Sequence, residues 1–355
     1  MATRRGRKVD GWLNFDKPLG LSSAQAVARV RRLFDAAKVG HGGTLDPLAS
    51  GVLPIAFGEA TKTVAWVMEG PKEYRFTLKF GIATATDDAE GEVVDRSDAR
   101  PDTAALIAAL AQFKGTILQR PPAFSAVKVA GQRAYALARA GNEVELATRQ
   151  VDVKSLELLE RTDVDRAILH VRCGKGTYIR SLARDLAIAV GSVGHVAALR
   201  RTACGPFHDG DAVTFEALEA VAGRGQVSAK GVLPQANPLS PPPELGHTSA
   251  LFGYLRPVAT ALDDIPALAL TDREAERLSS GMAVALSEEA RAGLESARDA
   301  GRAAAAIGTM SPAGDPAGPA NNARTGVVRA MAGDRLVAIA RIDAGLVRPV
   351  RVLNL

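Results

Sequence analysis

The spacing of apolar residues predicts both strands and helices in this chain. Over residues 72–80 every second position is apolar, as in a strand with one buried face: Tyr74, Phe76, Leu78 and Phe80. Residues 23–34 carry apolar side chains at helical spacing, and Ser22 with Gln25 forms a capping-box pattern just before them. Short alternating segments within 327–353 predict further strands.

A loop within residues 40–54 is the first candidate for chemistry. Its single acid, Asp46, follows a cluster of glycines and is flanked by apolar residues, and Pro47 favours an extended backbone at Asp46. A short acid on a loop with buried flanks is a carboxylate held in a fixed direction, which a nucleophile requires. The same residue types also build ordinary surface turns, so the pattern alone leaves a solvated aspartate open.

Composition narrows the class of protein. The chain has 355 residues, which suggests about two domains, and its net charge of +5 fits a polyanionic partner. Its two cysteines, Cys173 and Cys204, lack CxxC spacing, so we expect no disulfide, no metal site and a reducing cytoplasm. No apolar run is long enough to span a membrane. Residues 174–176 lack the spacing of a phosphate-binding loop, so no nucleotide cofactor is expected.

Residues 40–55 resemble a known family. They read GHGGTLDPLASGVLPI, and the TruB family of bacterial tRNA pseudouridine-55 synthases usually has a loop close to GHTGTLDPLATGVLPI. The resemblance implies that Asp46 is the catalytic nucleophile and that His41 fills the gap left by a base flipped out of the RNA. Gly42 stands where the family usually has threonine, so a bracing hydroxyl is lost and we expect a more mobile loop.

Three segments in the first third of the chain extend the resemblance. Lys17 and Pro18 match a KP motif that packs beside the active-site loop. Tyr74, in KEYRF, matches a catalytic tyrosine that stacks on the target base, although periodicity alone makes it a core aromatic. Residues 81–98 resemble a polar segment of the family that forms a solvated hairpin.

Three later segments complete the resemblance to the family. Residues 119–141 resemble a loop and helix that grip RNA, which makes Lys128 a substrate-binding candidate, and Phe124 there replaces the usual tyrosine. In GKGTYIRSL, the resemblance places Tyr178 in the uridine pocket and pairs Arg180 with the nucleophile. In the segment LRRT, the resemblance implies that Leu199 packs on the flipped base and that Arg200 and Arg201 contact the RNA backbone.

The resemblance also implies a fold and a reaction. We expect an α+β protein with a mixed sheet, a pseudouridine synthase catalytic domain and a small C-terminal PUA-like β-barrel. The expected reaction is isomerisation of uridine to pseudouridine at position 55 in the T loop of tRNA, without a cofactor and by a monomer. The expected domains are a basic flexible N-terminus, a catalytic domain, a proline-rich inter-domain segment, and a PUA-like domain with a low-complexity insertion near 288–325: residues 1–10, 11–234, 235–265 and 266–355.

Two other functions remain open from the residues. A glycoside hydrolase also breaks a bond to a sugar C1, but it uses two carboxylates, and the next acid after Asp46 is Glu59. A non-catalytic tRNA-binding or tRNA-folding module would use the same basic residues. Asp46, Tyr74 and Arg180 together favour the enzyme, because a binding module has no physical need for an ion-paired acid in its groove.

Overall fold

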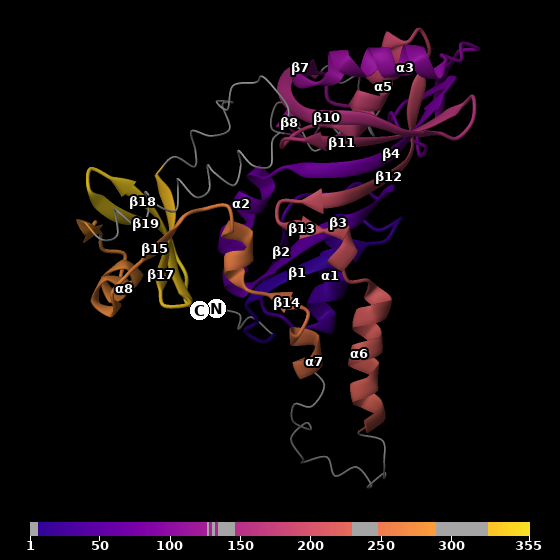
Figure 1. Ribbon diagram of the computed structural model, residues 1–355. Coiled ribbons are helices and arrows are strands. Elements are labelled where there is room, and N and C mark those ends of the chain that lie inside the picture. Colours follow the sequence, from indigo (N-terminus) through magenta and orange to yellow (C-terminus); the bar gives the residue numbers. More distant parts are fainter. Residues whose placement is uncertain (1–5, 126–127, 130–131, 134–145, 229–247, 289–325) are drawn as a thin grey trace.

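The computed structural model contains two large sheets and two two-stranded sheets in its described part (Figure 1). The two-stranded sheets are β5 (Ile82–Thr84) with β6 (Val93–Arg96) and β8 (Lys128–Val129) with β9 (Gln132–Arg133). Of the two large sheets, the main sheet has ten strands and the C-terminal sheet has five. The description covers these residues: 6–125, 128–129, 132–133, 146–228, 248–288 and 326–355.

The main sheet is mixed, as expected. Its path runs β14-β1-β3-β12-β4-β11-β10-β7, with β2 added to β3 and β13 to β12. Neighbours on this path are antiparallel except β12 and β3, which run parallel. The strands are β1 (Gly11–Lys17), β2 (Val39–His41), β3 (Ala49–Phe57), β4 (Lys72–Phe80), β7 (Gly115–Gln119), β10 (Arg149–Arg161), β11 (Arg166–Cys173), β12 (Gly194–Cys204), β13 (Phe207–His208) and β14 (Leu255–Arg256).

Helices pack on this sheet through their apolar sides. Ser22 and Gln25 form the predicted capping box at the start of α1 (Ser23–Leu33). Toward the β7 end of the sheet, α3 (Thr103–Leu110) lies beside α5 (Ile179–Ala189) (Figure 1). The other described helices are α2 (Val64–Glu69), which follows the 3₁₀ turn η1 (Gly58–Thr63), α6 (Phe215–Ser228) and α7 (Thr248–Phe252).

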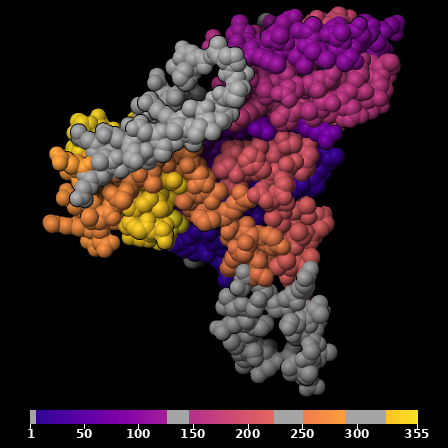
Figure 2. Space-filling view, viewed as in Figure 1, coloured from indigo at the N-terminus to yellow at the C-terminus, as the bar shows by residue number. Residues whose placement is uncertain are grey.

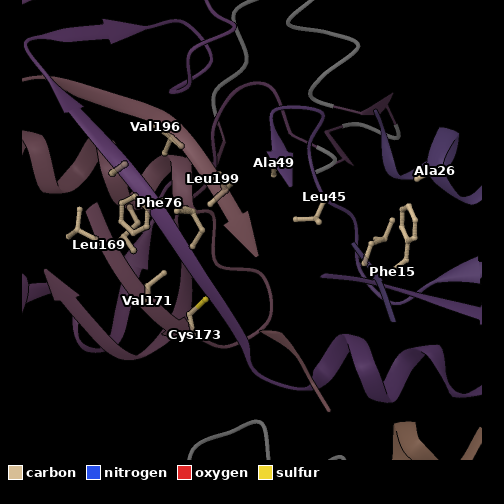
Figure 3. Close-up of a cluster of buried hydrophobic side chains, with 14 of the residues drawn as sticks. Phe15, Ala26, Leu45, Ala49, Phe76, Leu169, Val171, Cys173, Val196 and Leu199 are labelled. Atoms are coloured by element: carbon tan, nitrogen blue, oxygen red, sulfur yellow. The ribbon is translucent and has the colours of Figure 1, made fainter. Parts of the chain in front are cut away.

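One apolar core runs beneath the main sheet and includes the flanks of the Asp46 loop (Figure 3). The predicted alternation of β4 is confirmed, since Phe76 and Leu78 are buried on its inner face. Leu45 and Ala49, on either side of Asp46, are 4% and 0% exposed. The loop is therefore attached at both ends to the core, which restricts the directions its carboxylate can take.

The hairpin expected at 81–98 is present, and much of its turn is exposed, but one acid in it is buried. Strands β5 (Ile82–Thr84) and β6 (Val93–Arg96) pair antiparallel. Asp88, in the turn between them, is only 2% exposed. The expectation of a solvated segment is wrong at Asp88, because this acid is turned inward onto an arginine described below.

The C-terminal sheet runs β15-β17-β18-β19-β16 and carries α8 (Asp272–Ser279). Its longer strands confirm the alternating segments predicted from the sequence. In Figure 2 these residues (orange and yellow) lie against the indigo N-terminal part, and Trp12 shares an apolar cluster with Leu262, Val327 and Leu353. The strands are β15 (Ala267–Ala269), β16 (Val284–Ala285), β17 (Val327–Ala332), β18 (Arg335–Asp343) and β19 (Leu346–Val352).

Several expected segments lie partly outside the described residues. This applies to the start of the basic N-terminus, to most of the gripping loop and helix, to half of the proline-rich segment and to nearly all of the insertion. Residues 248–265 of the proline-rich segment are described, and they are not an open linker. They form α7, β14 and the 3₁₀ turn η4 (Val258–Leu262), and β14 adds to the edge of the main sheet through β1.

The parallel contact between β3 and β12 requires glycine at position 51. Gly51 has a φ of +99° and lies opposite Arg201 in the register, where an added Cβ would stand 2.2 Å from the Arg201 carbonyl oxygen. We predict that Gly51→Ala lowers the free energy of unfolding by about 3 kcal/mol or more, measured by urea titration. Gly210→Ala, where no atom lies within 4 Å of the new Cβ, is the matched control. A loss below about 1 kcal/mol at position 51 would contradict this description.

Candidate active site

The Asp46 loop is held by hydrogen bonds at its base. Ser23 Oγ accepts from Leu45 N at 2.8 Å and donates to Leu45 O at 2.9 Å, which joins the loop to α1. Ala49 N donates to Asp46 O at 3.0 Å as β3 begins. The Asp46 side chain is 39% exposed. A fixed backbone thus presents a carboxylate that a ligand can reach.

Gly42 does not loosen this loop. It is buried, donates from its N–H to Pro54 O at 2.8 Å, and accepts from Cys204 Sγ at 3.5 Å. A Cβ at this position would stand 2.8 Å from Val67 Cγ1. The expectation of greater mobility is therefore not supported, because α2 packs closely into the space that a larger side chain would occupy.

A pocket of about 600 Å³ opens at Asp46, within the usual size range of small-ligand sites. It brings together residues from the Asp46 loop, β4, the start of α5 and β12. Six of the residues expected from the sequence line it: Asp46, Tyr74, Tyr178, Arg180, Leu199 and Arg201.

Arg180 is the central cation of the pocket. Its side chain is 6% exposed, and Nη2 lies 2.8 Å from Asp46 Oδ2, so the expected ion pair is present. Nη1 lies 3.3 Å from Asp88 Oδ2. Nη1 also donates to Thr86 O and Nη2 to Phe124 O, each at 3.0 Å. Each terminal nitrogen therefore serves one carboxylate and one carbonyl, and this fixes the plane of the guanidinium.

Sequence reasoning missed Asp88 as part of the site. Asp88 Oδ1 accepts from Thr86 Oγ1 at 2.5 Å and from Glu90 N at 3.0 Å, so both of its oxygens have partners. The family pattern that residues 81–98 resemble includes Asp88, but it implies a solvated hairpin and gives this acid no role in the site. Only the fold shows that the hairpin turn points toward α5.

Tyr74 enters the pocket from β4 as a neutral group. Burial raises the pKa of Tyr74 to about 12, and the positive charge of Arg201 opposes this shift. The phenol therefore stays protonated at neutral pH and can offer its O–H and the face of its ring. Tyr178 is the N-cap residue of α5, and its main chain exchanges two hydrogen bonds with the Gln119 side chain.

Arg201, which is expected at the RNA backbone, is buried and forms hydrogen bonds within the protein. It is 1% exposed, and Nε donates to Val52 O at 2.7 Å while Nη2 donates to Gly43 O at 3.1 Å. Its charge and donors are used to tie the Asp46 loop to β12. Its neighbour Arg200 is partly exposed, but it is paired with two carboxylates, Asp16 at 2.9 Å and Asp209 at 3.4 Å.

Lys17 supports the loop from behind and does not line the pocket. It is 0% exposed, and Nζ donates to Pro18 O at 2.9 Å and to Leu21 O at 2.8 Å. This burial favours a supporting role for Lys17 over the expected direct contact with substrate. The turn that it stabilises is joined to the Asp46 loop, since Gly20 N donates to Pro47 O at 2.9 Å. Burial lowers the pKa of Lys17 to about 8, and the negative charge of nearby Asp46 only partly opposes this effect.

Two of the remaining expected residues, Pro18 and His41, lie outside the pocket wall. Pro18 is exposed in the turn after β1. His41 is partly buried at the end of β2, and its Nδ1 is buried without a hydrogen-bond partner. Burial lowers the pKa of His41, and the positive charge of Arg201 lowers it further. Lys128 lies in the two-residue strand β8 (Lys128–Val129), and its side chain is outside the described part.

Within the described residues, no group of three or more His, Cys, Asp or Glu side chains is placed to hold a metal ion. No helix of the described part is long and apolar enough to cross a membrane.

Comparisons with known proteins place this fold and site in a class. The fold is similar to a chain in the crystal structure of a Cbf5-Nop10-Gar1 complex, with a TM-score of 0.64, 23% identity, and coverage of 96% of this chain and 84% of that one. Residues 31–179 match the family described as "TruB family pseudouridylate synthase (N terminal domain)", and residues 180–263 match "tRNA pseudouridylate synthase B C-terminal domain". The class is thus that of the pseudouridylate synthases.

Full-length relatives specify the family. A protein from Gluconacetobacter diazotrophicus named tRNA pseudouridine synthase B is 47% identical over 99% of this chain and 100% of its own length. One of the same name from Rhodospirillum rubrum is 46% identical over 99% of each chain. The chain belongs to the TruB family, and it is an enzyme of the pseudouridine synthase type.

The Arg180 geometry yields a prediction about rate. Arg180→Lys keeps a positive charge but cannot serve both carboxylates from one rigid plane. We predict a single-turnover rate lower by about tenfold or more, roughly 1.4 kcal/mol in barrier, with tRNA affinity and its salt dependence nearly unchanged. Rapid-quench kinetics and filter binding measure the two quantities. Weaker binding with an unchanged single-turnover rate would assign Arg180 to RNA binding instead.

The buried Lys17 yields a prediction about pH. Between pH 8 and 10.5 the unfolded chain holds a proton on Lys17 that the folded chain has largely released, so this residue makes stability rise with pH in that window. The contribution is at most about 1.4 kcal/mol per pH unit. In urea titrations from pH 7.5 to pH 10.5, the free energy of unfolding of the wild type should rise with pH relative to that of Lys17→Met. Other groups titrate equally in both proteins, so the difference comes from Lys17. If the free energies of unfolding of the two proteins changed in parallel with pH, this prediction would be contradicted.

Proposed function

We propose that Asp46 is the nucleophile that isomerises a uridine to pseudouridine at position 55, in the T loop of tRNA. Membership of the TruB family makes uridine isomerisation in tRNA the reaction of this enzyme. The observation that carries the nucleophile is the Asp46–Arg180 ion pair at 2.8 Å, located on the wall of a pocket that also holds two tyrosines. Arginine stays charged at any working pH, so it is a permanent counter-ion for the carboxylate.

The pocket suits a single flipped nucleotide. A base in a folded RNA loop must leave its stack before chemistry can reach it. Tyr74, Tyr178 and Leu199 line the pocket with Asp46 and supply aromatic and apolar surface for the uracil ring. Ser125 Oγ is buried in the same wall without a hydrogen-bond partner, which leaves a polar group available for a base edge.

The reaction then requires no external oxidant or energy source. The N1–C1′ bond breaks, the uracil turns within the pocket, and C5 bonds to C1′. The proton on C5 is lost, and N1 ends with a proton, so atoms and charge balance. Asp46 forms the transient covalent bond, either to the base or to the sugar carbon. Tyr74, protonated at neutral pH, stacks on the ring and orients its rotation.

The remaining assignments are proposals of the same kind. We assign 11–234 to the catalytic domain and 266–355 to a PUA-like RNA-binding domain; the five-stranded sheet with α8 is compatible with this. We assign His41 to the space vacated by the flipped base, and Lys128 to the RNA. The enzyme acts as a cytoplasmic monomer without a cofactor.

The nucleophile is tested by Asp46→Asn. The change removes the only acid of the loop while phosphate contacts come from elsewhere, so we predict loss of conversion with tRNA affinity largely intact. Conversion is followed by tritium release or mass spectrometry under single-turnover conditions. Asp95→Asn, an exposed acid on β6, is the matched control and should convert normally. Turnover by Asp46→Asn within about tenfold of the wild type, under roughly 1.4 kcal/mol in barrier, would rule out Asp46 as nucleophile.

A further inference from the structure

Arg149 differs from the other cations of the pocket in keeping a buried donor, Nε, without a hydrogen-bond partner among the described residues. Arg180 is paired with two carboxylates, and Lys175 lies 2.6 Å from Glu69 Oε2. Lys72 and Arg201 are buried and donate to main-chain carbonyls of α2 and of the Asp46 loop. Arg149 lines the same pocket, and no carboxylate of the described residues pairs with it. Its positive charge is therefore uncompensated within that part of the chain.

The position of Arg149 is defined by Tyr178. Its guanidinium carbon lies 4.7 Å from the centroid of the Tyr178 ring, and Nη2 donates to Gly176 O. Gln119, its register partner on β7, clamps the Tyr178 main chain with hydrogen bonds of 3.0 Å and 2.8 Å. Two neighbouring residues of one strand pair thus hold the backbone and the ring of the same pocket tyrosine.

The donors of Arg149 are incompletely used. Its Nε is buried and has no hydrogen-bond partner. A buried donor without a partner is costly, by about 1–3 kcal/mol, so such a group in a pocket wall points to a ligand that completes it. A guanidinium offers donors in one plane that match the oxygens of a phosphate. A small turn of the side chain toward the pocket would present Nε and Nη to such an oxygen.

We propose that Arg149 binds a phosphate group next to the flipped uridine, 5′ or 3′ to it, while its guanidinium remains stacked on Tyr178. The proposal rests on the proposed function, because it assumes a nucleotide whose base enters this pocket. The base is attached to a backbone that cannot follow it inside, so a flanking phosphate must stay at the pocket edge. Arg149 would then contact both Tyr178, which packs on the flipped base, and a phosphate next to that base. Binding of the base in the pocket and binding of the RNA backbone are thereby coupled.

The test combines a protein change with a change in the RNA. T stem-loop RNAs are made with a neutral methylphosphonate on the 5′ or the 3′ side of the target uridine, next to an unmodified RNA. Binding is measured for the wild type, Arg149→Gln, Arg149→Lys and Lys154→Gln. Lys154 lies on the same strand, is 64% exposed and is paired with Asp152, so its change is a matched loss of charge outside the pocket.

Arg149→Gln should bind the unmodified RNA about tenfold more weakly and flatten its salt dependence by about 0.7–0.9 in slope, the value for one phosphate contact. One of the two neutral linkages should weaken the wild type equally and leave Arg149→Gln unaffected, and the side on which this occurs identifies the phosphate. Arg149→Lys should keep most of the salt dependence, since it retains the charge. Lys154→Gln should respond to the neutral linkages as the wild type does.

Three results would overturn the proposal. One is additive losses for Arg149→Gln with both neutral linkages. Another is wild-type affinity and salt dependence in Arg149→Gln. The third is a lower rate alone, which would mean that Arg149 acts only through Tyr178. If Arg149→Gln does not fold, Arg149→Lys with the same RNAs decides, because the wild-type response to one linkage must persist in it. Conversion of the unmodified RNA by the wild type is read in the same samples, so a failure of the proposed function is recognised separately.

Discussion

A buried guanidinium shared by two carboxylates is the interaction on which the site depends. Arg180 holds Asp46 and Asp88 with its two terminal nitrogens, and carbonyls of Thr86 and Phe124 complete its shell. Burying such charges is costly unless each is paired and hydrogen-bonded. Here the partners come from three segments, the Asp46 loop, the β5–β6 hairpin and the chain after β7, and the arginine itself comes from α5. Satisfying one arginine therefore requires these segments to assemble together, and the direction of the Asp46 carboxylate follows from that assembly.

Two further cations act as internal scaffolds. Lys17 donates to carbonyls of the turn after β1, and Arg201 donates to carbonyls of the Asp46 loop and of β3. Each replaces water that a loop backbone would otherwise need, so an irregular segment can be buried without orphaned carbonyls. The loop can then be rigid although it lacks regular secondary structure. Rigidity of this kind is what a positioned nucleophile requires.

The sequence predicted local structure and the pair at the centre of the site, but not its surroundings. The capping box at Ser22, the alternation of β4 and the C-terminal strands are short-range patterns, and the structure has them. The Asp46–Arg180 pair came from a resemblance across a long and specific motif. Asp88 was missed and Arg201 was assigned to RNA, because burial of a charged side chain is decided by segments far away in the chain. Gly42 shows the same limit, since its effect depends on the packing of Val67.

Pseudouridine mapping of an unmodified tRNA transcript tests the central claim most directly. The purified chain is incubated with the transcript in the presence of EDTA and without added cofactor, and pseudouridine is located at single-nucleotide resolution. The account predicts conversion of one uridine, at position 55 in the T loop, with no change elsewhere in the tRNA. Tight binding of the transcript without any pseudouridine would contradict it and would identify the pocket as part of an RNA-binding module.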